Sequence, residues 1–112
     1  MQTHSIGYEI LRKVYRKVVE RDEMFKRFVE RLCVSGLADE VYLVGSRARG
    51  DNSSSSDYDI VVVVNEDDVL GVVEKIAMLR KEAVPVDVVV LRKEDLKDPI
   101  YREMLMYKKK LC

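Results

Sequence analysis

Residues 41–64 have the sequence VYLVGSRARGDNSSSSDYDIVVVV, and this stretch decides the fold. Two runs of β-branched and apolar residues, Val41–Val44 and Ile60–Val64, predict two strands. The segment between them is rich in glycine, serine, arginine and aspartate, which is the composition of a turn followed by a loop. It begins with Gly-Ser and ends with Asp-Tyr-Asp, so a small-residue turn leaves the first strand and two carboxylates enter the second.

Helical and strand patterns alternate in the rest of the chain. The N-terminal pattern predicts one amphipathic helix, or two that divide at Asp22 with Asp22 as a cap, and Gly36 is a helix stop. The predicted elements are helix 6–33, strand 41–44, strand 57–64, helix 70–82, strand 86–91, a helical turn 93–97 and a final helix from Pro99 that ends in three lysines. This order, helix-strand-strand-helix-strand-helix, predicts an α+β fold with a small mixed sheet of three to four strands packed by helices.

The chain length predicts a single domain, residues 1–112, with N-terminal helix or helices in 1–35, a core in 41–91 and a C-terminal helix in 98–110. Twenty basic residues balance twenty acidic ones, which argues against a long nucleic-acid substrate. No apolar stretch is long enough to span a bilayer and the polar start is no signal peptide, so we expect no membrane contact and a cytoplasmic protein. Cys33 and Cys112 match no zinc or redox spacing, and we expect a core thiol and a frayed terminal one.

Three aspartates form a candidate metal site. Alternate residues of a strand share a face, so Asp57 and Asp59 project together while Tyr58 points away. Two neighbouring carboxylates repel each other unless a cation lies between them, and Mg²⁺ prefers such oxygen ligands. Asp87 is the only charge in an apolar run of seven residues, and a buried carboxylate needs a cation or a partner. Asp87 is therefore the candidate third ligand, or the base that deprotonates an incoming hydroxyl; ordinary cap and turn chemistry remains the alternative for all three.

The small-residue turn is a candidate phosphate-binding element. Gly45 lets the backbone turn sharply and approach a phosphate, and Ser46 adds a hydroxyl donor. Arg47 and Arg49 can pair with phosphate oxygens. The spacing of Gly45 and Gly50 imitates a P-loop, but Asp-Asn follows where Lys-Ser/Thr is required, so the P-loop interpretation fails.

Gly-Ser, ten residues, Asp-x-Asp and a third Asp on a following strand together resemble the signature of the DNA-polymerase-β-like nucleotidyltransferase superfamily. Within it, the chain is most similar to the minimal nucleotidyltransferases of prokaryotes over about residues 41–91. The resemblance implies a Mg²⁺- or Mn²⁺-dependent enzyme in which Gly45 and Ser46 bind a triphosphate. It also implies metal ligation by Asp57, Asp59 and Asp87, and it leaves the role of Arg47 less defined.

Members of this length resemble the antitoxin half of a two-protein system, in which the partner is a helical HEPN-domain ribonuclease toxin. The resemblance therefore implies transfer of AMP from ATP to a tyrosine hydroxyl of that toxin. Two alternatives stay open: a non-catalytic nucleotide-binding subunit that masks a partner by contact, and an enzyme acting on a small molecule such as an aminoglycoside. Apolar residues also flank the stripe from Tyr8 to Leu32, which is expected of an oligomer interface or of helix-on-sheet packing.

Overall fold

The computed structural model describes residues 5–53, 55–81 and 83–112. Its elements run in the order α1 (Ser5–Ser35), β1 (Glu40–Val44), α2 (Gly45–Arg49), β2 (Tyr58–Val64), α3 (Val69–Leu79), β3 (Val86–Arg92), the 3₁₀ helix η1 (Lys93–Lys97), α4 (Pro99–Met104) and β4 (Lys109–Lys110). The predicted α+β class with a mixed sheet is confirmed, and the sheet has four strands in the order β3-β2-β1-β4. The predicted helix end at Glu82 lies outside the described residues; α3 ends at Leu79.

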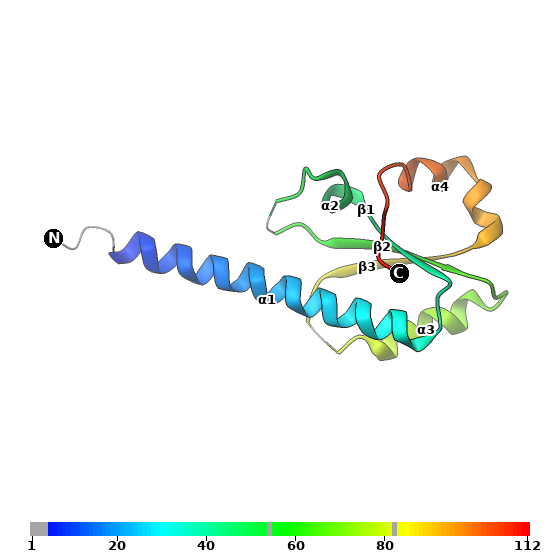
Figure 1. The fold of residues 1–112 in the computed structure, drawn as a ribbon, viewed down its shortest axis with the longest axis horizontal. Coiled ribbons are helices and arrows are strands. Elements are labelled where there is room, and N and C mark those ends of the chain that lie inside the picture. The colour runs from blue at the N-terminus through cyan, green and yellow to red at the C-terminus, as the bar shows by residue number, and fades with distance from the viewer. Residues whose placement is uncertain (1–4, 54, 82) are drawn as a thin grey trace.

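The central strand β2 is buried on both faces because helices cover both. Strand β1 pairs with it antiparallel and β3 pairs with it parallel. On one face, Ile60, Val62 and Val64 pack against α1 and α3, while Val61 and Val63 face η1 and α4. Figure 1 shows this layering, with α1 and α3 below the sheet and α4 above it. A continuous β-branched strand suits a position that is buried on both sides.

Helix α1 is a single helix of 31 residues, so of the two alternatives one unbroken helix is confirmed and a break at Asp22 is wrong. The Asp22 carboxylate accepts a hydrogen bond from the Tyr58 hydroxyl and pairs with Arg47 at 4.0 Å, so it serves a tertiary contact instead of a cap. The C-terminal half of α1 packs on the sheet, and the helix ends before Gly36, whose φ is +76°. The N-terminal half extends beyond the domain (Figure 1), which gives the molecule extents of 65 × 29 × 18 Å.

The C-terminus differs from both predictions made for it. Helix α4 ends at Met104, and Lys109–Lys110 form strand β4 against Tyr42 and Leu43 of β1, where a helix end was expected. Cys112 is joined to Cys33 by a disulfide, so the expectation of two free thiols is also wrong. The sulfur bridge and the hydrogen bonds with Val41 hold the last residues along the sheet edge, and the chain therefore cannot continue as a helix.

Aspartate side chains cap the starts of α3 and α4. The Asp68 carboxylate accepts a hydrogen bond of 3.0 Å from the backbone N–H of Gly71 at the start of α3, and Asp98 caps α4 in the same way. The predicted strand at 86–91 and the predicted helical turn at 93–97 are both present, as β3 and η1. In the described part of the chain, no helix is both long and apolar enough to cross a membrane.

Candidate active site

A cavity of about 560 Å³ lies between one end of the sheet and α4. Its polar lining comes from Gly45, Arg49, Asp59, Asp87 and Glu103. Its apolar lining comes from Val44, Ile60, Val89, Ile100, Met104, Met106 and Tyr107. The cavity thus combines charged groups at the strand ends with an apolar wall, which is the usual composition of a small-molecule site.

Two of the predicted acids meet in this cavity because of the sheet register. Asp59 on β2 is the direct partner of Asp87 on parallel β3, and on its other side it pairs with Val44, the last residue of β1. Burial raises the pKa of Asp59, the negative charge of Asp87 and a hydrogen bond with that side chain raise it further, and Asp57 adds to this, while Arg49 lowers it. The register therefore creates a concentrated negative charge beside the turn that begins at Gly45.

Gly45 is required by geometry at this turn. Its φ is +72°, a conformation that residues with a Cβ rarely adopt. A Cβ built on Gly45 would also collide with the Asp59 carboxylate. The glycine predicted to approach a phosphate therefore also makes room for the acid of the neighbouring strand.

The remaining predicted residues divide between the cavity and its surroundings. Arg49 lines the cavity and pairs with Asp51 at 3.1 Å. Ser46 is half-buried in the first turn of α2, next to Gly45, and Asp57 is exposed at the end of the loop before β2. Neither Ser46 nor Asp57 is among the described residues that line the cavity, although Asp57 is near enough for its charge to act on Asp59.

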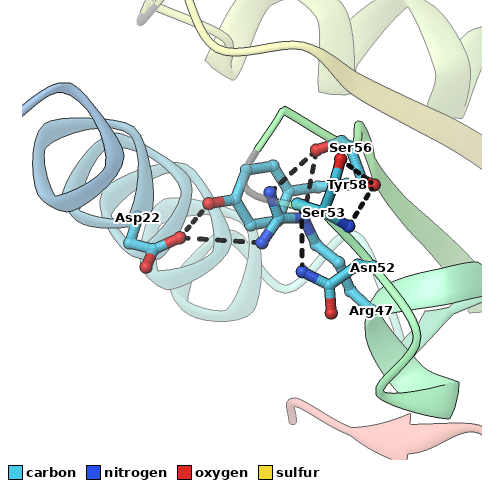
Figure 2. A network of polar contacts seen from close by, with 6 residues as sticks. All are labelled: Asp22, Arg47, Asn52, Ser53, Ser56 and Tyr58. Carbon is cyan, nitrogen blue, oxygen red and sulfur yellow. Dashed lines mark hydrogen bonds and ion pairs between the residues drawn. The ribbon is translucent and has the colours of Figure 1, made fainter. Parts of the chain in front are cut away.

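Arg47 lies on the α1 side of the sheet, in the network that Figure 2 shows. Its guanidinium is 3.9 Å from the centre of the Tyr58 ring and donates hydrogen bonds of 2.8 and 3.1 Å to the Ser56 carbonyl. The opposite face of the Tyr58 ring stacks on Phe25 of α1 at 4.1 Å. Burial and the hydrogen bond to Asp22 raise the pKa of Tyr58 to about 12, so its hydroxyl stays protonated and donating. These contacts join α1, α2, β2 and the loop before Asp57.

Arg47→Met should lower the free energy of unfolding by about 2 kcal/mol, because it removes the cation over the Tyr58 ring and the hydrogen bonds to Ser56. Arg49→Met is the matched control, and we expect it to change stability by less than about 0.5 kcal/mol because Arg49 is exposed. Urea unfolding of both variants measures this. Unchanged stability in Arg47→Met together with weaker ATP binding would instead support a phosphate-binding role for Arg47.

The predicted three-acid metal group is not assembled in the described residues. Among them, no three histidine, cysteine, aspartate or glutamate side chains lie close enough together to hold a metal ion. The Asp59–Asp87 pair nevertheless fits a divalent cation, because both carboxylates supply hard oxygen donors and their repulsion already raises the pKa of Asp59. The two acids on adjacent strands are therefore the residues that would hold Mg²⁺, with Asp57 close by.

Comparison with known proteins shows the family to which this fold and its cavity belong. A family model described as "Nucleotidyltransferase domain" matches residues 23–111. The chain belongs to this family. A crystal structure of a candidate nucleotidyltransferase from Sulfolobus solfataricus is 26% identical in sequence, with a TM-score of 0.62, over 87% of this chain and 84% of that one. No curated protein matches the chain.

The nucleotidyltransferase domain contains lining residues that the sequence did not indicate. Glu103, Met104 and Tyr107 reach the cavity from α4 and the turn after it. In the sequence they belonged to a helix that was expected to begin at Pro99 and to end in three lysines. Only the folding of α4 over the sheet, which the sequence pattern does not specify, brings them beside Asp59 and Asp87.

Replacing Asp59 by asparagine should stabilise the metal-free nucleotidyltransferase domain at neutral pH. Because the folded-state pKa of Asp59 is raised, the folded protein binds this proton more tightly than the unfolded chain does. The stabilisation that this tighter proton binding gives the folded state is complete below the ordinary aspartate pKa of about 4. It is lost as the pH rises through the raised pKa of Asp59 in the folded protein. Asp59→Asn removes the charge, so its Tm should exceed that of the wild type by a few degrees at pH 7 and not at pH 3.5.

The measurement is thermal unfolding in EDTA across this pH range, with Asp39→Asn as the control. Asp39 pairs with Lys93 near the opposite end of β1, so its loss should not stabilise the protein at any pH. An Asp59→Asn variant that is less stable than the wild type at pH 7 would contradict the inferred repulsion.

Proposed function

We propose that this nucleotidyltransferase transfers AMP from ATP to a protein hydroxyl in a Mg²⁺-dependent reaction. The observation that carries the proposal is the placement of Asp59 and Asp87 in one cavity with Gly45 and Arg49. Two carboxylates that repel each other attract a cation, and the glycine turn and the arginine suit the triphosphate that accompanies it.

Each residue has a distinct part in the proposed reaction. Asp59 and Asp87 would hold the cation with Asp57 as a third ligand, and Asp87 would be the base nearest the acceptor hydroxyl. Gly45, Ser46 and Arg49 would bind and orient the triphosphate, while Arg47 would fix the loop before Asp57. When bound, the divalent cation supplies charge neutralisation for the triphosphate and lowers the pKa of the attacking hydroxyl. The domain itself contributes mainly positioning and electrostatics.

We further propose that the acceptor is a tyrosine on a partner HEPN-domain toxin, for which this protein is the antitoxin in the cytoplasm. The resemblance to minimal antitoxin nucleotidyltransferases suggests the partner. The cavity rim is compatible with a protein acceptor, because Ile100, Met106 and Tyr107 expose 58–72% of their surface there. An apolar rim of this kind suits a protein surface better than a strongly polar sugar.

The test is label transfer with the purified domain and a helical HEPN-domain protein as the acceptor. ATP labelled at the α-phosphate should mark a tyrosine of that protein in Mg²⁺, and ATP labelled at the γ-phosphate should not. Label from the γ-position, or transfer that survives EDTA, would contradict the proposal. Neutralisation of the toxin by a variant that lacks all three aspartates would favour masking by contact, and label on an aminoglycoside in place of the protein would favour a small-molecule acceptor.

A further inference from the structure

The N-terminal half of α1 carries an apolar stripe that no other part of the described chain covers. From Gly7 to Glu20 no residue is buried, although the segment is rich in large apolar side chains. Those that are clearly exposed are Tyr8 (55%), Ile10 (57%), Leu11 (69%), Val14 (49%), Tyr15 (73%) and Val19 (39%). Clustered exposure of this kind marks an interaction site in a folded protein, whereas single exposed apolar residues do not.

This stripe continues the face of α1 that packs on the sheet. Leu11, Val18, Phe25 and Leu32 follow one another at intervals of seven, which places them on the same side of the helix. Phe25 is 7% exposed and Leu32 is fully buried, because the domain lies under this half of α1. Leu11 on the same side is 69% exposed. The N-terminal half of α1, to which it belongs, extends past the edge of the domain (Figure 1). An apolar residue at every seventh position is typical of a helix whose apolar face is covered along its whole length.

The exposed area reaches what a contact between two copies needs. The six exposed residues present on the order of 600 Å² of surface per chain, the upper end of what a monomer ordinarily leaves in one patch. Two such stripes facing each other would bury roughly 1,200 Å², the lower bound for specific protein interfaces.

Four of the six charged residues in this segment lie away from the pairing face. The segment has four basic residues and Glu9 as its only acid before Glu20. Glu9, Lys13, Arg16 and Glu20 recur at helical spacing and lie on the side opposite Leu11. Facing stripes therefore leave these four residues in solvent. The nearest cation to the stripe, Arg12, lies 5.7 Å from the centre of the Tyr8 ring of its own helix.

We propose that two copies of this chain dimerise through the N-terminal halves of α1, packed antiparallel. A parallel pair would bring both domains to the same end and the same face of the helices, where each would occupy the space of the other. The antiparallel pair places the domains at opposite ends and stacks Leu11, Val14 and Tyr15 against the equivalent stripe of the second copy. This interface is independent of nucleotide transfer.

The test is the molar mass of the full chain in solution, measured by light scattering during gel filtration. The wild type should have twice the chain mass of 13.0 kDa. Leu11→Glu with Tyr15→Glu should weaken the dimer at least about 100-fold, because two central apolar contacts are replaced by buried charges. The matched control, Lys13→Glu with Arg16→Glu, changes charge on the opposite side of the same turns and should remain a dimer.

Cysteine cross-linking tests the orientation. Val14→Cys, near the centre of the stripe, should form an interchain disulfide on mild oxidation, and Tyr8→Cys, near its end, should not. Equal cross-linking at both positions would overturn the antiparallel arrangement.

A wild type that is monomeric at about 100 µM would overturn the dimer itself, as would a dimer that survives the paired glutamate substitutions. If circular dichroism shows loss of helix in the glutamate variant, Leu11→Ala with Tyr15→Ala gives the same test with strong helix formers.

Discussion

Asp59→Asn and Asp87→Asn should each reduce nucleotide transfer by about 10³-fold or more. Asparagine keeps the size of aspartate but removes the charge that would hold the cation. The cation is expected to stabilise the transition state by several kcal/mol, and each 1.36 kcal/mol corresponds to a tenfold change in rate. Both side chains line the same cavity from adjacent strands, so neither can replace the other. Initial rates with α-labelled ATP at saturating Mg²⁺ give the result.

Asp39→Asn is again the control, since it removes a carboxylate from the opposite end of β1 and should leave transfer unchanged. Asp57→Asn tests whether the exposed loop acid is a ligand in the loaded enzyme: a loss as large as that of Asp59→Asn would assign it to the metal. Undiminished transfer by Asp59→Asn and Asp87→Asn would eliminate the proposed mechanism. The stabilising effect expected of Asp59→Asn in EDTA separates a loss of transfer in this variant from a folding defect.

Removing the Cys33–Cys112 disulfide should destabilise the domain by about 4 kcal/mol and lower its Tm by more than about 10 °C. The bridge joins residues 79 positions apart, so its loss frees nearly three quarters of the chain in the unfolded state. In the folded state it connects the end of α1 to the last residue, beside the hydrogen bonds that join Leu111 and Cys112 to Val41. The paired variant Cys33→Ala with Cys112→Ala and the reduced wild type should therefore unfold at similar temperatures.

Differential scanning calorimetry with and without a thiol reductant measures this change. The alanine pair is its own control, because reductant should not shift its Tm further. A wild type whose Tm is the same in oxidising and reducing buffer would show that hydrogen bonding along the edge of β1 is sufficient to hold the C-terminus. The Lys108 ammonium also lies over the Tyr42 ring at this edge, 4.8 Å from its centre.

The glycine turn, the strands around it and the two cavity aspartates were all predictable, because each depends on local chemistry. Runs of β-branched residues favour strands, and Asp87 stood out as a charge in an apolar run. Its position directly beside Asp59 follows once β2 and β3 are parallel neighbours. Arg47 was not predictable in the same way: its nearness to Gly45 in sequence suggested phosphate binding, but its described contacts are with Tyr58, Ser56 and Asp22.

The sequence by itself determined the α+β class, the approximate strand positions and the requirement for glycine at position 45. Tertiary structure decided the rest. Helix α1 passes through Asp22 without a break because the partners of that carboxylate, Tyr58 and Arg47, come from 25 to 36 residues away. The terminal lysines form a strand because β1 offers an unpaired edge and Cys33 holds the last residue. Such outcomes depend on contacts between distant segments, whose free energies exceed the small helix and strand preferences of the residues involved.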